Sequence, residues 1–81
     1  MNIDKAKQLF EEIVELCYES GNPRIIEVVD SIYDEIQESK EIHKVIISLE
    51  ELQLVINETE LLPDEEESVN EVREKIEMLS E

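Results

Sequence analysis

The eight residues QESKEIHK at positions 37–44 decide how this chain folds, because they join two helix-like patterns without a glycine or a proline. Up to Ile36, apolar residues recur every three or four positions, and this spacing predicts further apolar residues at 39 or 40 and at 43. The chain instead has polar residues there, and a new apolar series begins at Ile42, with Ser39 available to cap a new helix. This change of phase predicts a break. The alternative is one helix of about 35 residues, which would force the chain to dimerise.

Clearer signals mark the other helix ends. In the segment Gly21–Pro23, the glycine ends one helix, the asparagine caps the next, and the proline takes its first position. Further along, Pro63 precedes Asp64, which can cap a last helix, and Glu67 lies three residues on, as in a capping box. The spacing of apolar residues therefore predicts four helices, over residues 3–20, 23–38, 41–57 and 64–80.

The apolar residues of each predicted helix lie on one face and form the predicted core. These residues are Ile3, Ala6, Leu9, Phe10, Ile13, Val14, Leu16 and Cys17, then Ile25, Val28, Val29, Ile32, Tyr33 and Ile36, then Ile42, Val45, Ile46, Leu49, Leu52 and Ile56, and finally Val69, Val72, Ile76 and Leu79. We predict an all-α fold in one helical domain over residues 1–81. It is either a small four-helix bundle or two stacked helical hairpins, with the first helix paired to the second and the third to the fourth.

The chain has 81 residues and one cysteine, so it has no internal disulfide, and it lacks a Cys/His cluster that could bind structural zinc. A core of this size rarely supplies more than about 3–5 kcal/mol of stability. Oligomerisation or binding to another protein is the remaining support, so a homodimer is one arrangement we consider. Cys17 lies among apolar helical residues, and we expect it to behave as a buried, small hydrophobic side chain.

The formal net charge is −16, from 23 acidic and 7 basic residues. Such a surface repels nucleic acid and anionic membranes, since both are bound through Lys and Arg, and it attracts a basic protein partner. The N-terminal segment does not resemble a signal peptide, and no run of apolar residues is long enough to cross a membrane. We therefore expect a cytoplasmic protein that binds neither nucleic acid nor membranes directly.

No combination of residues in the sequence indicates catalysis, a cofactor or a metal centre. The di-metal motif of helical bundles needs a glutamate three residues before a histidine, and the residue three before His43 is Lys40. The acidic segment 57–68 lacks the central glycine of a calcium-binding loop. One glycine cannot build a phosphate-binding loop, and His43 has no triad partner at a recognisable spacing, so we expect a surface histidine and no enzyme activity.

The third predicted helix carries more apolar residues than one buried face needs. Ile47 and Leu54 are two turns apart and lie more than 90° from the core residues, and Val55 is a third apolar residue off that face. A helix that is apolar on several sides is either central in its bundle or covered by a partner. Our first hypothesis is a non-enzymatic interaction or regulatory module that binds a protein through Ile47, Leu54 and Val55.

The second hypothesis starts from the acidic fourth helix. Its glutamates could form a negative ridge, and Glu67, Glu71 and Glu74 are the candidate contacts with a basic protein surface. Acidic inhibitors, immunity proteins and DNA mimics have this charge character, and the comparison is an analogy alone. A face of glutamates can also do no more than keep a small protein in solution.

Overall fold

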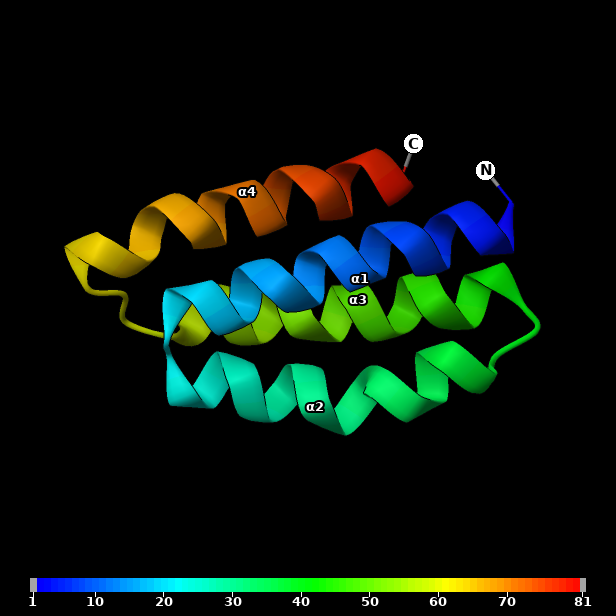
Figure 1. The fold of residues 1–81 in the computed structure, drawn as a ribbon, viewed down its shortest axis with the longest axis horizontal. Helices are drawn as coiled ribbons and strands as arrows, with labels where there is room; N and C mark the ends of the chain where they lie inside the picture. Colours follow the sequence, from blue (N-terminus) through cyan, green and yellow to red (C-terminus); the bar gives the residue numbers. More distant parts are fainter. Residues whose placement is uncertain (1, 81) are drawn as a thin grey trace.

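Four helices and three short connections make up the described part of the chain in this computed structural model, which covers residues 2–80 (Figure 1). The helices are α1 (Ile3–Ser20), α2 (Pro23–Glu38), α3 (Ile42–Glu58) and α4 (Pro63–Ser80), and no strand occurs among residues 2–80. The prediction of an all-α four-helix bundle is confirmed. The predicted ranges of the first two helices match α1 and α2, while α3 begins and ends one residue later than predicted and α4 begins one residue earlier.

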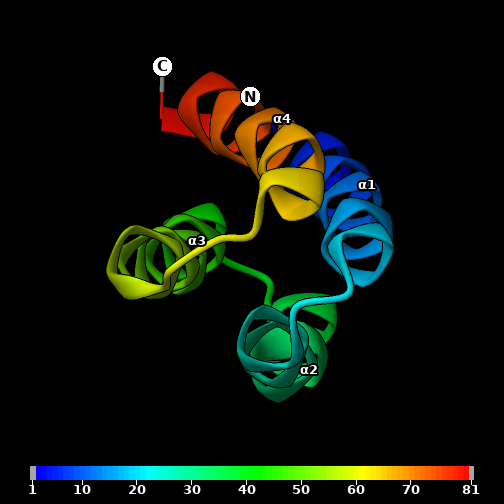
Figure 2. The same cartoon turned by 90° about the vertical axis from the view of Figure 1, so that its left-hand side faces the viewer.

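Consecutive helices run in opposite directions, and the fourth returns to lie beside the first (Figures 1 and 2). The most extensive packing joins α1 to α4 and α2 to α3, and α1 also touches α3 across the bundle. The arrangement is therefore a closed bundle, and the predicted pairing of the first helix with the second and of the third with the fourth does not give its largest interfaces. Each helix turns one side to the core and another side outward (Figure 2).

The break predicted near Ser39 is present, and the single long helix is wrong. Ser39 has extended backbone angles (φ −68°, ψ 141°), and its N–H donates to the carbonyl of Ile36 at 3.2 Å, which ends α2. Its hydroxyl accepts from the N–H of Glu41 at 3.3 Å and donates to the carbonyl of Glu41 at 3.0 Å. Ser39 therefore closes α2 rather than capping α3, whose N-cap position is Glu41 without a side-chain hydrogen bond.

The turn between α1 and α2 follows its predicted chemistry. Gly21 has a φ of 72°, in the left-handed region that costs other residues energy, and its N–H donates to the carbonyl of Tyr18 at 3.1 Å. Asn22 then accepts two backbone N–H groups of the first turn of α2 on Oδ1, at 3.0 and 3.2 Å. Pro23 is the first residue of α2, where no N–H is needed.

The start of α4 differs from the prediction of a cap by Asp64 and a capping box with Glu67. Pro63 is itself helical, so Leu62 precedes the helix and Glu65 becomes its third residue. The N–H of Leu62 donates to Oε1 of Glu65 at 2.9 Å, which is the glutamate half of a capping box. The fixed φ of proline suits the first helical position, so the helix starts earlier and Glu67 lies beyond the reach of the cap.

The core lies between the four helices and consists of residues from the predicted faces. Its fully or nearly fully buried apolar residues are Ala6, Phe10, Ile13, Val14, Cys17, Ile25, Val29, Ile32, Ile36, Val45, Leu49, Leu52, Ile56, Val69, Val72, Ile76 and Leu79. The other residues that the spacing assigned to the core are only partly buried; they are Ile3, Leu9, Leu16, Val28, Tyr33, Ile42 and Ile46. Within residues 2–80, no helix has both the length and the apolar composition that crossing a bilayer requires.

Candidate protein-interaction surface

The outer side of α3 carries two large aliphatic side chains that the fold leaves in water. Ile47 is 53% exposed and Leu54 is 61% exposed. Seven residues separate them, which places them about 20° apart around the helix and about 10 Å apart along it. They point away from the core residues of α3, so they form one short ridge, which we call the α3 ridge.

The exposure of the α3 ridge rules out one explanation for the surplus apolar residues of this helix, a central position in the bundle. A central helix would be covered on all sides, but α3 occupies one corner of the bundle (Figure 2). Within residues 2–80, no segment covers Ile47 or Leu54. Val55, the third predicted contact, is partly buried, and it follows Ser48 by seven residues on the flank of α3 that faces α2. The structure thus brings Ile47 and Leu54 together and separates Val55 from them.

Carboxylates line the α3 ridge. Glu50 and Glu51 lie between Ile47 and Leu54 in sequence and on opposite sides of the ridge. Both are exposed, and neither carboxylate has a hydrogen bond or an ion pair in the described part of the chain. Lys44 is the one basic residue other than histidine in α3, and Glu41 holds its Nζ at 3.7 Å. The ridge is therefore an apolar strip between negative charges.

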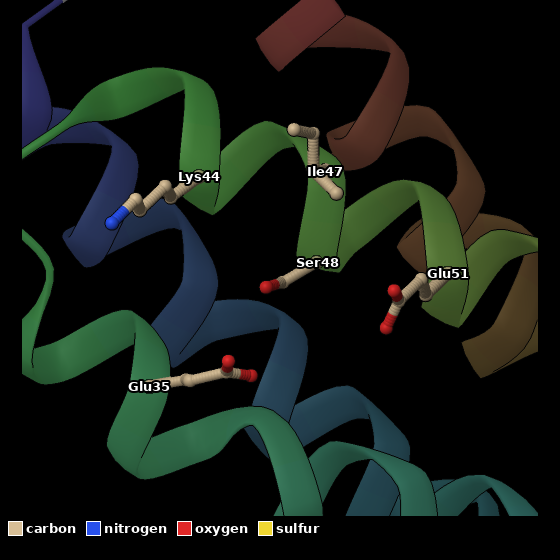
Figure 3. Close-up of a pocket in the computed structure, with 5 residues that line it drawn as sticks. All are labelled: Glu35, Lys44, Ile47, Ser48 and Glu51. Carbon is tan, nitrogen blue, oxygen red and sulfur yellow. The ribbon is translucent and has the colours of Figure 1, made fainter.

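A hollow lies between α2 and α3 on one side of the ridge, with a volume of about 230 Å³. Glu35 of α2 extends into the space between the two helices, Ser48 and Glu51 project from α3 into the same space, and Ile47 also lines it (Figure 3). Lys44 completes the lining. The carboxylate of Glu35, like that of Glu51, has no hydrogen bond or ion pair within residues 2–80. The hollow thus joins an aliphatic wall to two unpaired carboxylates.

A second hollow, of about 300 Å³, lies beside the other end of the α3 ridge. It is lined by Leu54, Glu50, Gln53 and Asn57, all from α3. The first hollow lies on the flank of α3 that faces α2, and the second lies on the opposite flank. Each end of the ridge is therefore next to a depression that contains at least one glutamate.

The acidic candidates of α4 lie on a different face. Glu67, Glu71 and Glu74 are exposed, and none of their carboxylates has a hydrogen bond or an ion pair in the described part of the chain. Their spacing of four and three residues places them along the outer side of α4. The structure therefore groups them with one another but not with Ile47 and Leu54, because the outer sides of α3 and α4 face different directions (Figure 2).

Glu65 does not belong to that acidic face, although its sequence neighbours are exposed. It is 7% exposed, and besides the N–H of Leu62 its Oε1 accepts from Nδ2 of Asn22 at 3.2 Å. The hydroxyl of Ser20 accepts from the N–H of Asn22 at 3.3 Å and donates to the carbonyl of Cys17 at 2.7 Å. These contacts tie the turn between α1 and α2 to the start of α4, so Glu65 has a structural role.

The two tyrosines link α1 to α2 through carboxylates, an arrangement that sequence reasoning did not find. The hydroxyl of Tyr33 donates to Oε1 of Glu11 at 2.9 Å, and the hydroxyl of Tyr18 donates to Asp30. These hydrogen bonds, and then burial, raise the pKa of both tyrosines above the ordinary value of 10.0, because the neutral phenol is the donor. The ring of Tyr33 also packs against Phe10, with centroids 5.8 Å apart.

Cys17 and His43 are the remaining polar candidates of the sequence. Cys17 is fully buried, as predicted, and burial raises the pKa of its thiol to about 12. His43 is exposed, with Nε2 3.5 Å from a carboxylate oxygen of Glu41. Across residues 2–80, no three side chains of His, Cys, Asp or Glu lie close enough together to hold a metal ion.

No protein-family model matches this chain, and neither the curated proteins nor the solved structures contain a match.

Proposed function

We propose that this protein is a non-enzymatic interaction module that binds another protein through the α3 ridge. The observation that supports it is the joint exposure of Ile47, at 53%, and Leu54, at 61%, on one outer side of α3. Single exposed apolar residues are common on protein surfaces, but these two are aligned along one helix and lie next to two hollows. Covering a large aliphatic side chain completely contributes about 1.5–3 kcal/mol, so two half-exposed ones can support docking.

The test compares two variants as baits in an extract of the source cell. One combines Ile47→Glu with Leu54→Glu, and the control places Glu at Met78, which is 54% exposed on α4. We expect at least one protein to be captured by the wild type and by Met78→Glu but not by the double variant. The proposal is wrong if all three baits, folded to the same extent by circular dichroism, capture the same proteins in the same amounts.

A second candidate function is an acidic inhibitor that occupies a basic protein surface, as immunity proteins and DNA mimics do. It is supported by the exposed and unpaired carboxylates of Glu67, Glu71 and Glu74. In this case, changing all three to Gln should abolish capture of the partner, and raising the salt concentration should weaken the complex strongly. Loss of capture in the Ile47→Glu and Leu54→Glu variant, with no effect of the three Gln changes, would instead favour the α3 ridge.

We also infer a cytoplasmic location. Its support is that Cys17 is a free, buried thiol and that the fold holds together by core packing without a disulfide, which is typical of a reducing compartment. Cell fractionation with an antibody to the protein tests this inference. Recovery of the protein with a secreted or membrane fraction would contradict it.

A further inference from the structure

We propose that the element that docks on the α3 ridge is a basic amphipathic helix, whose apolar residues pack on Ile47 and Leu54 while its Lys or Arg side chains enter the two flanking hollows. This inference rests on the proposed function and names the chemistry of the partner. It follows from three features of the surface: the length of the ridge, the composition of the hollows and the sign of the surrounding charge.

The length of the ridge fits a helix. Ile47 and Leu54 are separated by seven residues of α3, or about 10 Å along its axis. A partner helix that lies along α3 has apolar residues at the same separation on one face, because positions i, i+3, i+4 and i+7 share a side. The partner can therefore cover both ends of the α3 ridge with one continuous apolar face.

The hollow between α2 and α3 has the chemistry that a long basic side chain needs. Ile47 provides an aliphatic wall, while Glu35 and Glu51 provide unpaired carboxylates inside the same depression (Figure 3). Lys and Arg pack their methylene stems on apolar surface while their charged groups reach polar partners. An incoming cation would therefore pair with Glu35 and Glu51, while the Nζ of Lys44 stays with Glu41, 3.7 Å away.

The second hollow repeats this combination at the other end of the ridge. Leu54 provides the apolar wall, and Glu50 provides a carboxylate without a hydrogen bond or an ion pair within residues 2–80. The side-chain amides of Gln53 and Asn57 add oxygen atoms that can accept further N–H groups. Basic residues on both sides of the partner's apolar face would therefore find carboxylates on both sides of the α3 ridge.

The charge distribution favours this partner over a second copy of the chain. Two copies facing each other through α3 would bring Glu50 and Glu51 of each copy together, and each copy has a formal net charge of −16. Like charges placed together across an interface suppress association, whereas a basic partner turns the same carboxylates into attraction and speeds the encounter. The surface is thus suited to a basic partner and unsuited to itself.

The test is calorimetric titration with synthetic peptides at about 0.15 M salt, where the charges of distant groups are largely screened. The first peptide is a helix-forming sequence with Leu on one face and Lys and Arg on its flanks. The second has the same composition in an order that removes the apolar face, and the third keeps the apolar face but replaces the basic residues by Gln. We expect the first peptide to bind the wild type at least about tenfold more tightly than either control.

Two pairs of protein variants locate the binding site. Leu54→Glu should weaken binding of the first peptide by about tenfold or more, and Met78→Glu should leave it nearly unchanged. Replacing Glu35 and Glu51 by Gln should weaken binding several-fold. Replacing Glu67 and Glu71 by Gln, which changes the net charge equally, should have a much smaller effect if charge acts locally.

Each contrary result has a distinct meaning. Equal binding of the first two peptides would show that overall charge alone drives the interaction and would overturn the inference. Equal binding of the first and third peptides would show that basic residues are not selected and would overturn it as well. Self-association of the bare protein that Leu54→Glu abolishes would assign the ridge to a second copy. If a cellular protein requires the α3 ridge but the basic peptide does not bind, this inference fails and the proposed function remains.

Discussion

Replacing Glu65 tests a buried carboxylate contact that joins two distant parts of the bundle. In the wild type, its Oε1 accepts from the N–H of Leu62 at 2.9 Å and from Nδ2 of Asn22 at 3.2 Å. Glu65→Ala removes both hydrogen bonds at once. It leaves the core residues unchanged, so the effect reports on the connection between the turn after α1 and the start of α4.

The expected loss follows from the burial of the two donors. Asn22 is 7% exposed, so its Nδ2 cannot regain water freely, and an unsatisfied buried donor costs about 1–3 kcal/mol. Loss of a helix cap costs about 0.5–2 kcal/mol, and we take the low end because the hydrogen bond from Leu62 is only partly buried. We therefore expect Glu65→Ala to lower the free energy of unfolding by about 2–3 kcal/mol.

Urea unfolding followed by far-UV circular dichroism measures this loss, and a thermal scan provides a second reading. A loss of about 2–3 kcal/mol in a domain of this size lowers the melting temperature by roughly 10–20 °C. Glu65→Gln keeps an oxygen acceptor at the same position, so it should cost about 1 kcal/mol or less. Glu67→Ala, two residues further along α4, is the matched control, and it should change stability by less than about 0.5 kcal/mol because Glu67 is exposed and its carboxylate is unpaired.

Equal effects of Glu65→Ala and Glu67→Ala would contradict the role of the Glu65 hydrogen bonds. So would a larger effect of Glu67→Ala, since that is the result expected if Asp64 capped α4 with Glu67 as its capping-box partner. A loss in Glu65→Gln as large as in Glu65→Ala would show that the negative charge, rather than the hydrogen-bond acceptor, is what matters.

Three further predictions concern other parts of the molecule. Leu52→Ala, at a fully buried position of α3, should destabilise the fold by about 2–5 kcal/mol in urea unfolding. Leu54→Ala, on the exposed side of the same helix, should change stability by less than about 0.5 kcal/mol. Similar losses in the two variants would contradict the assigned orientation of α3. Cys17 should not react with a thiol reagent at pH 8 in the folded protein, because burial raises the pKa of its thiol to about 12, and it should react fully in denaturant. Rapid labelling of the native protein would show that Cys17 is accessible. In a spectrophotometric pH titration, Tyr18 and Tyr33 should ionise above 10.0 in the folded state. Their hydrogen bonds should stabilise the fold below pH 10, and this stabilisation should be lost as the pH rises through the raised pKa values. Ionisation at the ordinary pKa would show that the phenol–carboxylate pairs do not form in solution.

The features that the sequence predicts well are local. The turn at Gly21–Pro23 depends on a left-handed glycine, an asparagine cap and a proline at the first helical position, all within three residues. The buried face of each helix follows from apolar spacing, and the same spacing placed Ile47 and Leu54 away from the core. The sequence predicts the start of α4 less well, because Pro63 and Asp64 each suggest a different first residue. The hydrogen bond from Asn22 to Glu65, across 43 residues of sequence, is found in the structure in which α4 starts at the earlier of these two residues.

The features that the sequence could not predict depend on which helices become neighbours. Glu35 lines the hollow beside Ile47 only because α2 packs against α3. The hydrogen bonds from Tyr18 to Asp30 and from Tyr33 to Glu11 span 12 and 22 residues, and they require the relative rotation of α1 and α2. An up-and-down bundle does place Asn22 and Leu62 at the same end of the molecule. The order of the helices therefore indicates that Asn22 lies near the start of α4, although neither segment alone indicates this.

The proposed binding of a basic protein element along the outer side of α3 can be followed residue by residue. The most direct test is a ¹H–¹⁵N correlation spectrum of the labelled protein, recorded during titration with the basic amphipathic peptide. We predict that the largest shifts occur at residues 44–54 and at Glu35, with small changes over residues 67–74. Shifts centred on residues 67–74, or spread evenly over the acidic surface, would contradict the claim and place the interaction on α4 or in overall charge alone.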